Sequence, residues 1–422
     1  MARLLAERHE RVLGVDSGAP DEAAGLGDAG VEVSLDVDGT ELLEDVRTLV
    51  KSPGVPQDAP VVAGARERGI EVTGELEVSW RLMPNRFCAV TGTNGKTTTT
   101  ELIGHLYRTA GRPVEVAGNV GTPVAALALE GIDPEATVVC ECSSFQLEDS
   151  SAFAPECSVF LNLAPDHLDR HGTIEDYRDA KLRVFANQRD GDAGVVNGDE
   201  PALAGEPRGG AERVVFCREG KGCEMSLVDG ELVWQGEPLI EAAELRLLGA
   251  HNVENAMAAA AAALASGLPQ DAVTEGLKTF EGVAHRLESV REYAGVVWVN
   301  DSKATNVSAA LAGIEAFDGG LHLIAGGSVK DESFEGLADA VAERASAVHL
   351  IGEAAEQIAE ALAGTGVPVH RDGTLEAAVA SAAGEAVAGE VVLLSPACAS
   401  FDQFRDYEAR GDRFRELVEA LS

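Results

Sequence analysis

Six consecutive residues, Gly92-Thr93-Asn94-Gly95-Lys96-Thr97, have the types and the spacing of a phosphate-binding loop. The sequence predicts a buried strand before them, Phe87–Val90, and a helix after them, Thr97–Ala110. In such a unit the backbone N–H groups and the helix dipole face an anion, Lys adds a positive charge, and the Thr hydroxyl can reach Mg²⁺. The loop lacks the first glycine of a standard Walker A loop, because residue 90 is Val. We still expect it to bind a nucleoside triphosphate, against the simpler interpretation of a glycine-rich turn with a capping Thr.

A carboxylate ends another predicted strand, Thr137–Glu141. Ligands of open α/β sheets bind at the carboxyl ends of the strands, so Glu141 is well placed to hold the Mg²⁺ that also meets Thr97. The alternative is a solvated Glu beside a pair of serines that cap a helix, and the local sequence does not separate the two.

Three further segments carry residue types that could do chemistry. Asp166, His167 and Asp169 cluster within four positions after a strand, which favours a metal or phosphate role. The segment Asn300–Asn306 concentrates donors and acceptors at a helix N-terminus, where they could bind a ribose or a carboxylate. Lys181 lies on an amphipathic helix, Tyr177–Ala186, and its spacing alone predicts a surface lysine with a solvated amine.

The elements that must position these residues fall into three blocks of α/β type. We expect a Rossmann-like unit over residues 1–75, a central P-loop-type domain over 76–282, and a second Rossmann-like domain over 283–422. The strands predicted to build them are Val12–Asp16, Val31–Leu35, Val46–Val50, Ile70–Thr73, Phe87–Val90, Val114–Ala117, Thr137–Glu141, Ser158–Leu163, Val296–Asn300, Leu321–Ala325, Ala347–Ile351 and Val391–Leu394. The Ala-rich run Asn252–Ser266 is predicted to be a tightly packed helix.

Composition excludes several classes of protein. With 33 basic and 71 acidic residues the net charge is −38, which repels nucleic acid and anionic membranes. No apolar run approaches the roughly 18 residues of a membrane span, and the N-terminus lacks the pattern of a signal peptide, so we expect a cytoplasmic protein. The seven cysteines include no C-x-x-C pair, and we expect reduced thiols, with neither disulfides nor a zinc site.

Taken together, these motifs resemble the Mur ligases, the ATP-dependent amide-forming enzymes of peptidoglycan precursor synthesis. The short loop Thr91–Thr97 is similar to that family's own variant of the phosphate loop. The segments Ser143–Glu148 and Ser395–Phe404 resemble the branch that adds D-glutamate to UDP-N-acetylmuramoyl-L-alanine. The resemblance extends from about residue 52 to the C-terminus, and the motifs are specific when they occur together.

The resemblance implies ATP, two Mg²⁺ ions and a CO₂-derived carbamate on Lys181, which reverses the prediction from spacing alone. It implies that the catalytic residues are Lys96, His167, Lys181 and Lys303. The implied metal ligands are Thr97, Glu141, His167 and carbamylated Lys181. The implied ATP contacts are Gly92, Thr93, Asn94, Gly95, Lys96, Thr97, Thr98, Asn252, Asn255, Arg286 and Asp301. The implied contacts with the muramoyl and glutamate substrates are Asp16, Ser52, Asn119, Ser143, Gln146, Thr305, Lys330, Ser400, Phe401 and Tyr407.

One part of the family's pattern has no counterpart in this sequence. The N-terminal strand and glycine-rich loop that help to grip uridine diphosphate are missing ahead of Ala2, so we expect either a misplaced start or weakened nucleotide-sugar binding. The alternatives that stay open are a sister Mur or folylpolyglutamate-type ligase, a nucleotide switch or kinase, and a catalytically impaired ATP-binding module. A monomer acting on small molecules is expected.

Overall fold

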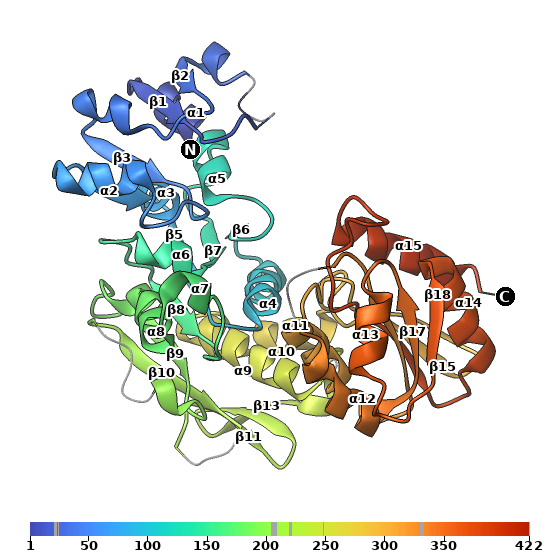
Figure 1. Cartoon of the computed structure of the whole chain (residues 1–422). Helices are drawn as coiled ribbons and strands as arrows, with labels where there is room; N and C mark the ends of the chain where they lie inside the picture. Colours follow the sequence, from blue (N-terminus) through green and yellow to red (C-terminus); the bar gives the residue numbers. More distant parts are fainter. Residues whose placement is uncertain are drawn as a thin grey trace. The chain divides into compact units, whose positions relative to one another are not determined.

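A computed structural model describes residues 1–20, 23, 25–203, 209–218, 222–247, 249–329 and 333–421. These residues form two compact units (Figure 1). The first comprises Met1–Glu244 and Glu254–Thr279, and the second comprises Leu245–Val253 and Phe280–Ser422. The α/β class is confirmed, whereas the division into three domains stays a prediction.

The central sheet of the first unit contains nine strands among the described residues, in the order β13-β12-β11-β10-β9-β8-β5-β7-β6. Their bounds are β5 Arg86–Thr91, β6 Val114–Gly118, β7 Thr137–Glu141, β8 Cys157–Phe160, β9 Ala193–Asn197, β10 Glu212–Cys217, β11 Met225–Val228, β12 Glu231–Trp234 and β13 Glu237–Glu241. The strands from β6 to β11 pair in parallel, and β12 and β13 add an antiparallel edge. The inner strands β5, β7 and β8 are almost wholly buried, as a parallel sheet covered on both faces requires.

Helices accompany this sheet, and the one that follows the phosphate loop is α4, Lys96–Thr109. The others are α5 Val124–Glu130, α6 Ser144–Glu148, α7 Leu168–His171, α8 Ile174–Leu182, α9 Ala250–Ala265 and α10 Gln270–Thr279. The predicted Ala-rich helix is confirmed as α9, in which Ala256–Ala263 are fully buried. The predicted helix Tyr177–Ala186 ends earlier than expected, because a 3₁₀ turn replaces its last residues.

The four strands predicted near the N-terminus are present in the described residues, but they pair as two separate parallel ribbons. One ribbon joins β1 (Val12–Val15) to β2 (Val31–Ser34), and the other joins β3 (Thr48–Lys51) to β4 (Glu71–Gly74). The helices of this region are α1 Ala2–Glu7, α2 Pro60–Glu67 and α3 Glu75–Leu82.

The second unit has a sheet of six strands within the part of the chain described, in the order β14-β15-β19-β16-β17-β18. Its strands are β14 Glu288–Tyr293, β15 Val296–Asn300, β16 Leu321–Gly326, β17 Ala345–Ile351, β18 Val369–Gly373 and β19 Val391–Leu394. The helices are α11 Val307–Ile314, α12 Ala338–Arg344, α13 Ala355–Ala361, α14 Leu375–Glu385 and α15 Tyr407–Glu419. All but β14 are parallel, and only β14 and β18 escaped prediction. Both are partly exposed edge strands without a continuous apolar run.

One expectation about the cysteines was wrong. Cys217, the last residue of β10, forms a disulfide with Cys223. The other five cysteines, all in the described part of the chain, are buried free thiols, as predicted. The two partners lie six positions apart, and that spacing alone does not reveal the bond.

Candidate active site

The loop between β5 and α4 has the conformation that a phosphate cradle needs. Gly92 and Gly95 have φ angles of 154° and 81°, which favour glycine over residues with a side chain. A Cβ atom at Gly95 would also collide with Asn255 Oδ1. Gly95 is the N-cap of α4, so the N-terminal end of that helix dipole faces the loop.

Two asparagines that are distant in the sequence support this loop. Asn162 Oδ1 accepts hydrogen bonds from the backbone N–H of Thr93 at 3.2 Å and of Asn94 at 2.9 Å. The buried Asn255 lies against Gly95, and its Oδ1 accepts a hydrogen bond from Thr99 Oγ1 on α4 at 3.4 Å. Lys96 Nζ donates to the loop carbonyls of Gly92 and Thr93 at 3.0 and 2.8 Å, so its charge is held over the cradle.

Lys181 contacts the same loop, which corrects the prediction from its spacing. Its side chain is 1% exposed, and Nζ donates to the carbonyl of Gly92 at 2.7 Å. The amine also lies 4.5 Å from the ring centroid of Tyr177. Burial, and then the nearby charge of Lys96, holds the pKa of Lys181 well below its ordinary value. The site thus contains a buried amine with a strong tendency to lose its proton.

Glu141 ends β7 as predicted, and it is buried, which rules out the solvated alternative. Its Oε1 accepts a hydrogen bond from Asn119 Nδ2 at 3.1 Å. Its Oε2 is buried and has no hydrogen-bond partner among the described residues. A buried carboxylate oxygen left in this state is costly unless a cation meets it, so the geometry fits a divalent metal ligand.

His167 lies at the start of α7 with a φ of 53°, a left-handed conformation that few residues adopt. Asp166 accepts a hydrogen bond from the backbone N–H of His167 at 2.9 Å, and its Oδ2 lies 3.5 Å from Nε2 of the ring. The imidazole is half exposed and contacts Phe145, with 4.9 Å between the ring centroids. It is therefore accessible to a metal or a phosphate.

Ser143 and Gln146 form a capping box at the start of α6. Ser143 Oγ accepts from the backbone N–H of Gln146 at 3.3 Å, and Gln146 Oε1 accepts from that of Ser143 at 2.9 Å. The helix-capping role considered for the serines is confirmed here. Gln146 is buried, whereas the side chain of Asn119 is exposed and donates to Glu141.

Sequence reasoning missed the side chains that hold the segment after β3, where Ser52 lies exposed. Lys51 is buried, lies 2.6 Å from Asp149 and donates to the carbonyl of Val55 at 2.8 Å. Arg170 donates to three carbonyls of the same turn, those of Pro53, Gly54 and Val55, at 2.9–3.3 Å. Asp149 and Arg170 are both distant in the sequence from the segment that they hold, so no local sequence pattern predicts these contacts.

The other residue predicted to contact uridine is Asp16, which lies at the end of β1. It is exposed, and its Oδ1 accepts a hydrogen bond from the backbone N–H of Gly18 at 2.8 Å. The carboxylate therefore holds the turn that follows the strand and stays open to solvent.

In the second unit, Asp301 follows β15 and is buried. Its Oδ2 accepts from Ser395 Oγ at 2.8 Å, and its Oδ1 accepts from the N–H of Leu287 at 3.2 Å. Burial raises the pKa of Asp301 to about 7, although Ser395 and the charge of Arg286 oppose the rise. The carboxyl group therefore joins the loop after β15 to the loop after β19.

Four other predicted residues of this unit, Lys303, Thr305, Ser400 and Phe401, lie in the same two loops, and Tyr407 begins α15. Lys303 Nζ lies 5.8 Å from the ring centroid of Tyr407. Ser400 is buried, whereas Phe401 is 74% exposed. Thr305 is half-buried beside the start of α11, and Lys330 lies outside the described residues.

Arg410 on α15 was not predicted, and it links these loops. Its guanidinium is buried and donates to both oxygens of Ser302, at 2.9 and 2.8 Å, and to the carbonyls of Cys398 and Ala399 at 3.1 and 3.4 Å. Burial lowers the pKa of Arg410 to about 10, which still leaves it charged at neutral pH. The signal for it in the sequence is weak, because arginines are common on exposed helix faces.

The structure therefore brings the predicted residues together in two groups, one in each unit. The phosphate loop gathers Lys96, Asn255 and Lys181, and the carboxyl ends of β15 and β19 gather Asp301 and Lys303. Asn252 is buried and belongs with the second unit. No helix in the described ranges is both long and apolar enough to cross a membrane.

Comparisons with known proteins cover the full chain. Residues 90–263 match the Mur ligase middle domain, and residues 285–398 match the glutamate ligase domain of Mur ligases. The UDP-N-acetylmuramoylalanine–D-glutamate ligase of Pelotomaculum thermopropionicum is 43% identical over 100% of this chain and 95% of its own. The ligases of the same name from Solibacter usitatus and Salinibacter ruber are each 41% identical, with the same coverage.

Solved structures share the fold at lower identity. The MurF ligase of Thermotoga maritima in complex with ADP superposes with a TM-score of 0.64 and 18% identity, covering 99% of this chain and 98% of that one. The UDP-N-acetylmuramate–alanine ligase of the same organism gives a TM-score of 0.61 at 20% identity, covering 99% and 96%. At this level of identity the two structures show the fold, and each of them covers 99% of this chain.

Proposed function

This chain belongs to the Mur ligase family, and on that premise we propose that it joins D-glutamate to UDP-N-acetylmuramoyl-L-alanine in the synthesis of peptidoglycan precursors. It is an ATP-dependent ligase that forms an amide bond. One observation within the site carries the proposal: the buried amine of Lys181 donates a hydrogen bond to the carbonyl of Gly92. A nucleotide switch or a kinase has no need of such an amine inside its phosphate loop.

The reaction follows from the chemistry of the carboxylate. A carboxylate is a poor acyl donor, so its oxygen first takes the γ-phosphoryl group of ATP, which releases ADP and forms an acyl phosphate. The amine of D-glutamate then attacks the acyl carbon. The tetrahedral intermediate expels phosphate, and the amine loses a proton as the amide forms.

In this proposal the phosphate loop binds and orients ATP. Its backbone N–H groups and the start of α4 face the phosphates, and Lys96 leaves the carbonyls of Gly92 and Thr93 to meet the γ-phosphate. The support that Asn162 and Asn255 give the loop holds its N–H groups in place before the nucleotide arrives. Such preorganisation lowers the free energy needed to arrange charge in the transition state.

The residues present fit Mg²⁺. Thr97, Glu141, His167 and Lys181 would hold the two ions, which neutralise charge that develops on the transferred phosphoryl group. The Oε2 of Glu141, which is buried and has no hydrogen-bond partner in the described part of the chain, supports this assignment directly. We propose that Lys181 acts as a carbamate: its neutral amine adds to CO₂, a proton is lost, and the product is an anionic oxygen ligand.

In the second unit, the loops after β15 and β19 would bind D-glutamate. Lys303 offers a charge to a substrate carboxylate, and Ser400 and Thr305 offer hydroxyl donors beside it. Lys330, Phe401 and Tyr407 would complete this pocket, while Arg286 and Asp301 would contact the nucleotide. We further propose that the enzyme works in the cytoplasm as a monomer.

The substrate assignment is tested by phosphate release with ATP, Mg²⁺ and UDP-N-acetylmuramoyl-L-alanine across a panel of amino acids. We expect release only with D-glutamate, since the chain resembles that branch along its full length. Release that depends on another amino acid would point to a sister ligase. Release indifferent to every amino acid would reject the ligase assignment altogether.

Replacing Glu141 by Gln removes one anionic oxygen but keeps the side-chain volume. We expect the Mg²⁺ concentration for half-maximal activity to rise by about tenfold or more, as it does when metal sites lose a supporting group. Glu115→Gln is the matched control, because Glu115 is exposed on the neighbouring strand β6. An unchanged Mg²⁺ dependence of Glu141→Gln would show that this carboxylate is not a metal ligand.

A further inference from the structure

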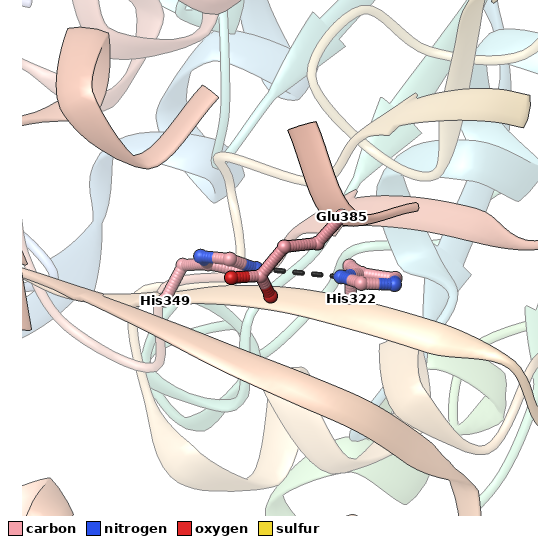
Figure 2. Close-up of side chains that lie close together, drawn as sticks. All are labelled: His322, His349 and Glu385. Carbon is pink, nitrogen blue, oxygen red and sulfur yellow. Dashed lines mark hydrogen bonds between the residues drawn. The ribbon is translucent and has the colours of Figure 1, made fainter. Parts of the chain in front are cut away.

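Three histidines on adjacent strands of the second unit have no role in the proposed reaction. His322, His349 and His370 lie on β16, β17 and β18 and form a stack, with ring centroids 5.7 and 5.0 Å apart. His322 and His349 are buried, and their facing nitrogens, Nδ1 of His322 and Nε2 of His349, are 3.4 Å apart (Figure 2).

The outer nitrogen of each buried ring contacts a carboxylate. His322 Nε2 lies 3.1 Å from Glu390 Oε2, and His349 Nδ1 lies 3.1 Å from Asp372 Oδ2. In a neutral ring that donates to its carboxylate, the proton is on the outer nitrogen. The inner nitrogen of each ring then carries a lone pair, and the two lone pairs face each other. If the proton of one ring moves to its inner nitrogen, the outer nitrogen of that ring presents a lone pair to the carboxylate, and these two groups repel each other. With both rings neutral, a hydrogen bond between the inner nitrogens leaves one ring without an N–H for its carboxylate, whereas a cation between the rings lets both outer nitrogens keep theirs.

A third ligand atom lies beside the two inner nitrogens. Glu385, at the end of α14, places a carboxylate oxygen within 4.8 Å of one nitrogen of each buried ring (Figure 2). It also lies 3.1 Å from His370 Nε2, although the two atoms are not aligned as a hydrogen bond. Because the Glu385 side chain is 42% exposed, it can rotate inward, and it leaves a path for a solvated ion to enter.

We propose that His322, His349 and Glu385 bind one divalent transition-metal ion of the zinc class. The separation of 3.4 Å between the inner nitrogens equals about the edge of a tetrahedron whose metal–nitrogen bonds are roughly 2.0–2.1 Å. The outer contacts with Glu390 and Asp372 are the carboxylate–histidine pairs that orient metal-binding imidazoles. Neutral imidazole and carboxylate are ligands for zinc, whereas magnesium prefers an all-oxygen shell.

The position of the cluster indicates a structural role. His322 is the second residue of β16, so it lies toward the amino end of a strand whose carboxyl end leads to Ser328, which bridges to Ala399 in the loop after β19. A metal there would join β16, β17 and the end of α14 without touching those loops. Three ligands from separate elements would then be held by one ion.

The test is titration of Zn²⁺ alone into the full chain, freed of any affinity tag, in excess Mg²⁺. We expect one equivalent of zinc to bind, with an X-ray absorption spectrum of nitrogen and oxygen ligands only. Glu385→Gln and His322→Gln should each weaken binding by about tenfold or more. Glu360→Gln, an exposed glutamate on the neighbouring helix α13, should leave it unchanged.

Several results would overturn the proposal. One is the absence of stoichiometric zinc binding, which would mean that an additional proton, and not a metal ion, removes the repulsion between the inner nitrogens of the two rings. Another is sulfur in the absorption spectrum, which would place the ion at a cysteine. A third is binding that survives Glu385→Gln but is lost in His167→Gln, which would place zinc at the catalytic centre. Since Glu385 is exposed, its variant tests the proposal even where His322→Gln does not fold.

Discussion

Replacing Lys181 by Met lowers turnover by about 10²–10³-fold, the size expected when one preorganised charge is removed from a transition state. Met fills nearly the same buried volume, so the fold is retained. What is lost is the amine, which lies 2.7 Å from the carbonyl of Gly92 and whose pKa burial lowers. A neutral amine is the form that CO₂ modifies. The measurement is phosphate release under saturating substrates, with ATP affinity determined separately.

Two further variants separate the carbamate from the charge of the lysine. Lys181→Arg keeps a positive charge that cannot become a carbamate, so it should be as inactive as Lys181→Met. Lys181→Ala should recover part of its turnover when acetate is added, because acetate can occupy the place of the carbamate oxygens. An active Lys181→Arg variant would mean that the positive charge is what the reaction needs. Lys278→Met, at a partly exposed lysine of α10, is the control for general loss of a lysine.

Replacing Arg410 by Leu destabilises the second unit by about 3 kcal/mol or more. The guanidinium donates to Ser302, Cys398 and Ala399, and hydrogen bonds from a charged donor contribute about 1.5–3 kcal/mol each. Once these oxygens are buried without a donor, the loops after β15 and β19 lose the link through α15, and the bond between Asp301 and Ser395 remains. The KM for D-glutamate should then rise more than the KM for ATP. Denaturant unfolding and steady-state kinetics measure the two effects.

Arg413→Leu on the same helix is the matched control. Arg413 is partly exposed and pairs with Glu376 and Glu416 at the surface, so its loss should change stability by less than about 1 kcal/mol. Arg410→Lys keeps a charge but replaces the planar fork by a single ammonium group, and should recover only part of the loss. Equal stability of Arg410→Leu and Arg413→Leu would show that the buried contacts do not hold the loops.

Some features of the candidate site depend on residues that are close in the sequence, and others depend on contacts between distant segments. The phosphate loop, the strand that ends in Glu141 and the helix after the loop all depend on runs of a few residues, and each was predicted within one or two positions of where it lies. Lys181 was misjudged from spacing, because a helical pattern does not reveal which neighbour covers a given face. The resemblance to the Mur ligases indicated instead a lysine inside the site, and the burial of its amine against the phosphate loop agrees with that expectation.

The sequence by itself determined the class of fold, the nucleotide chemistry and the branch of the family, since these depend on short motifs and on periodic apolar runs. Only the tertiary structure decided which groups are buried beside one another: Asn162 and Asn255 on the phosphate loop, Arg410 across two loops, and His322 facing His349. Their partners lie from 11 to more than 150 positions away. The burial and the electrostatic environment of a side chain arise from packing between distant segments, so they can be determined only from the folded structure.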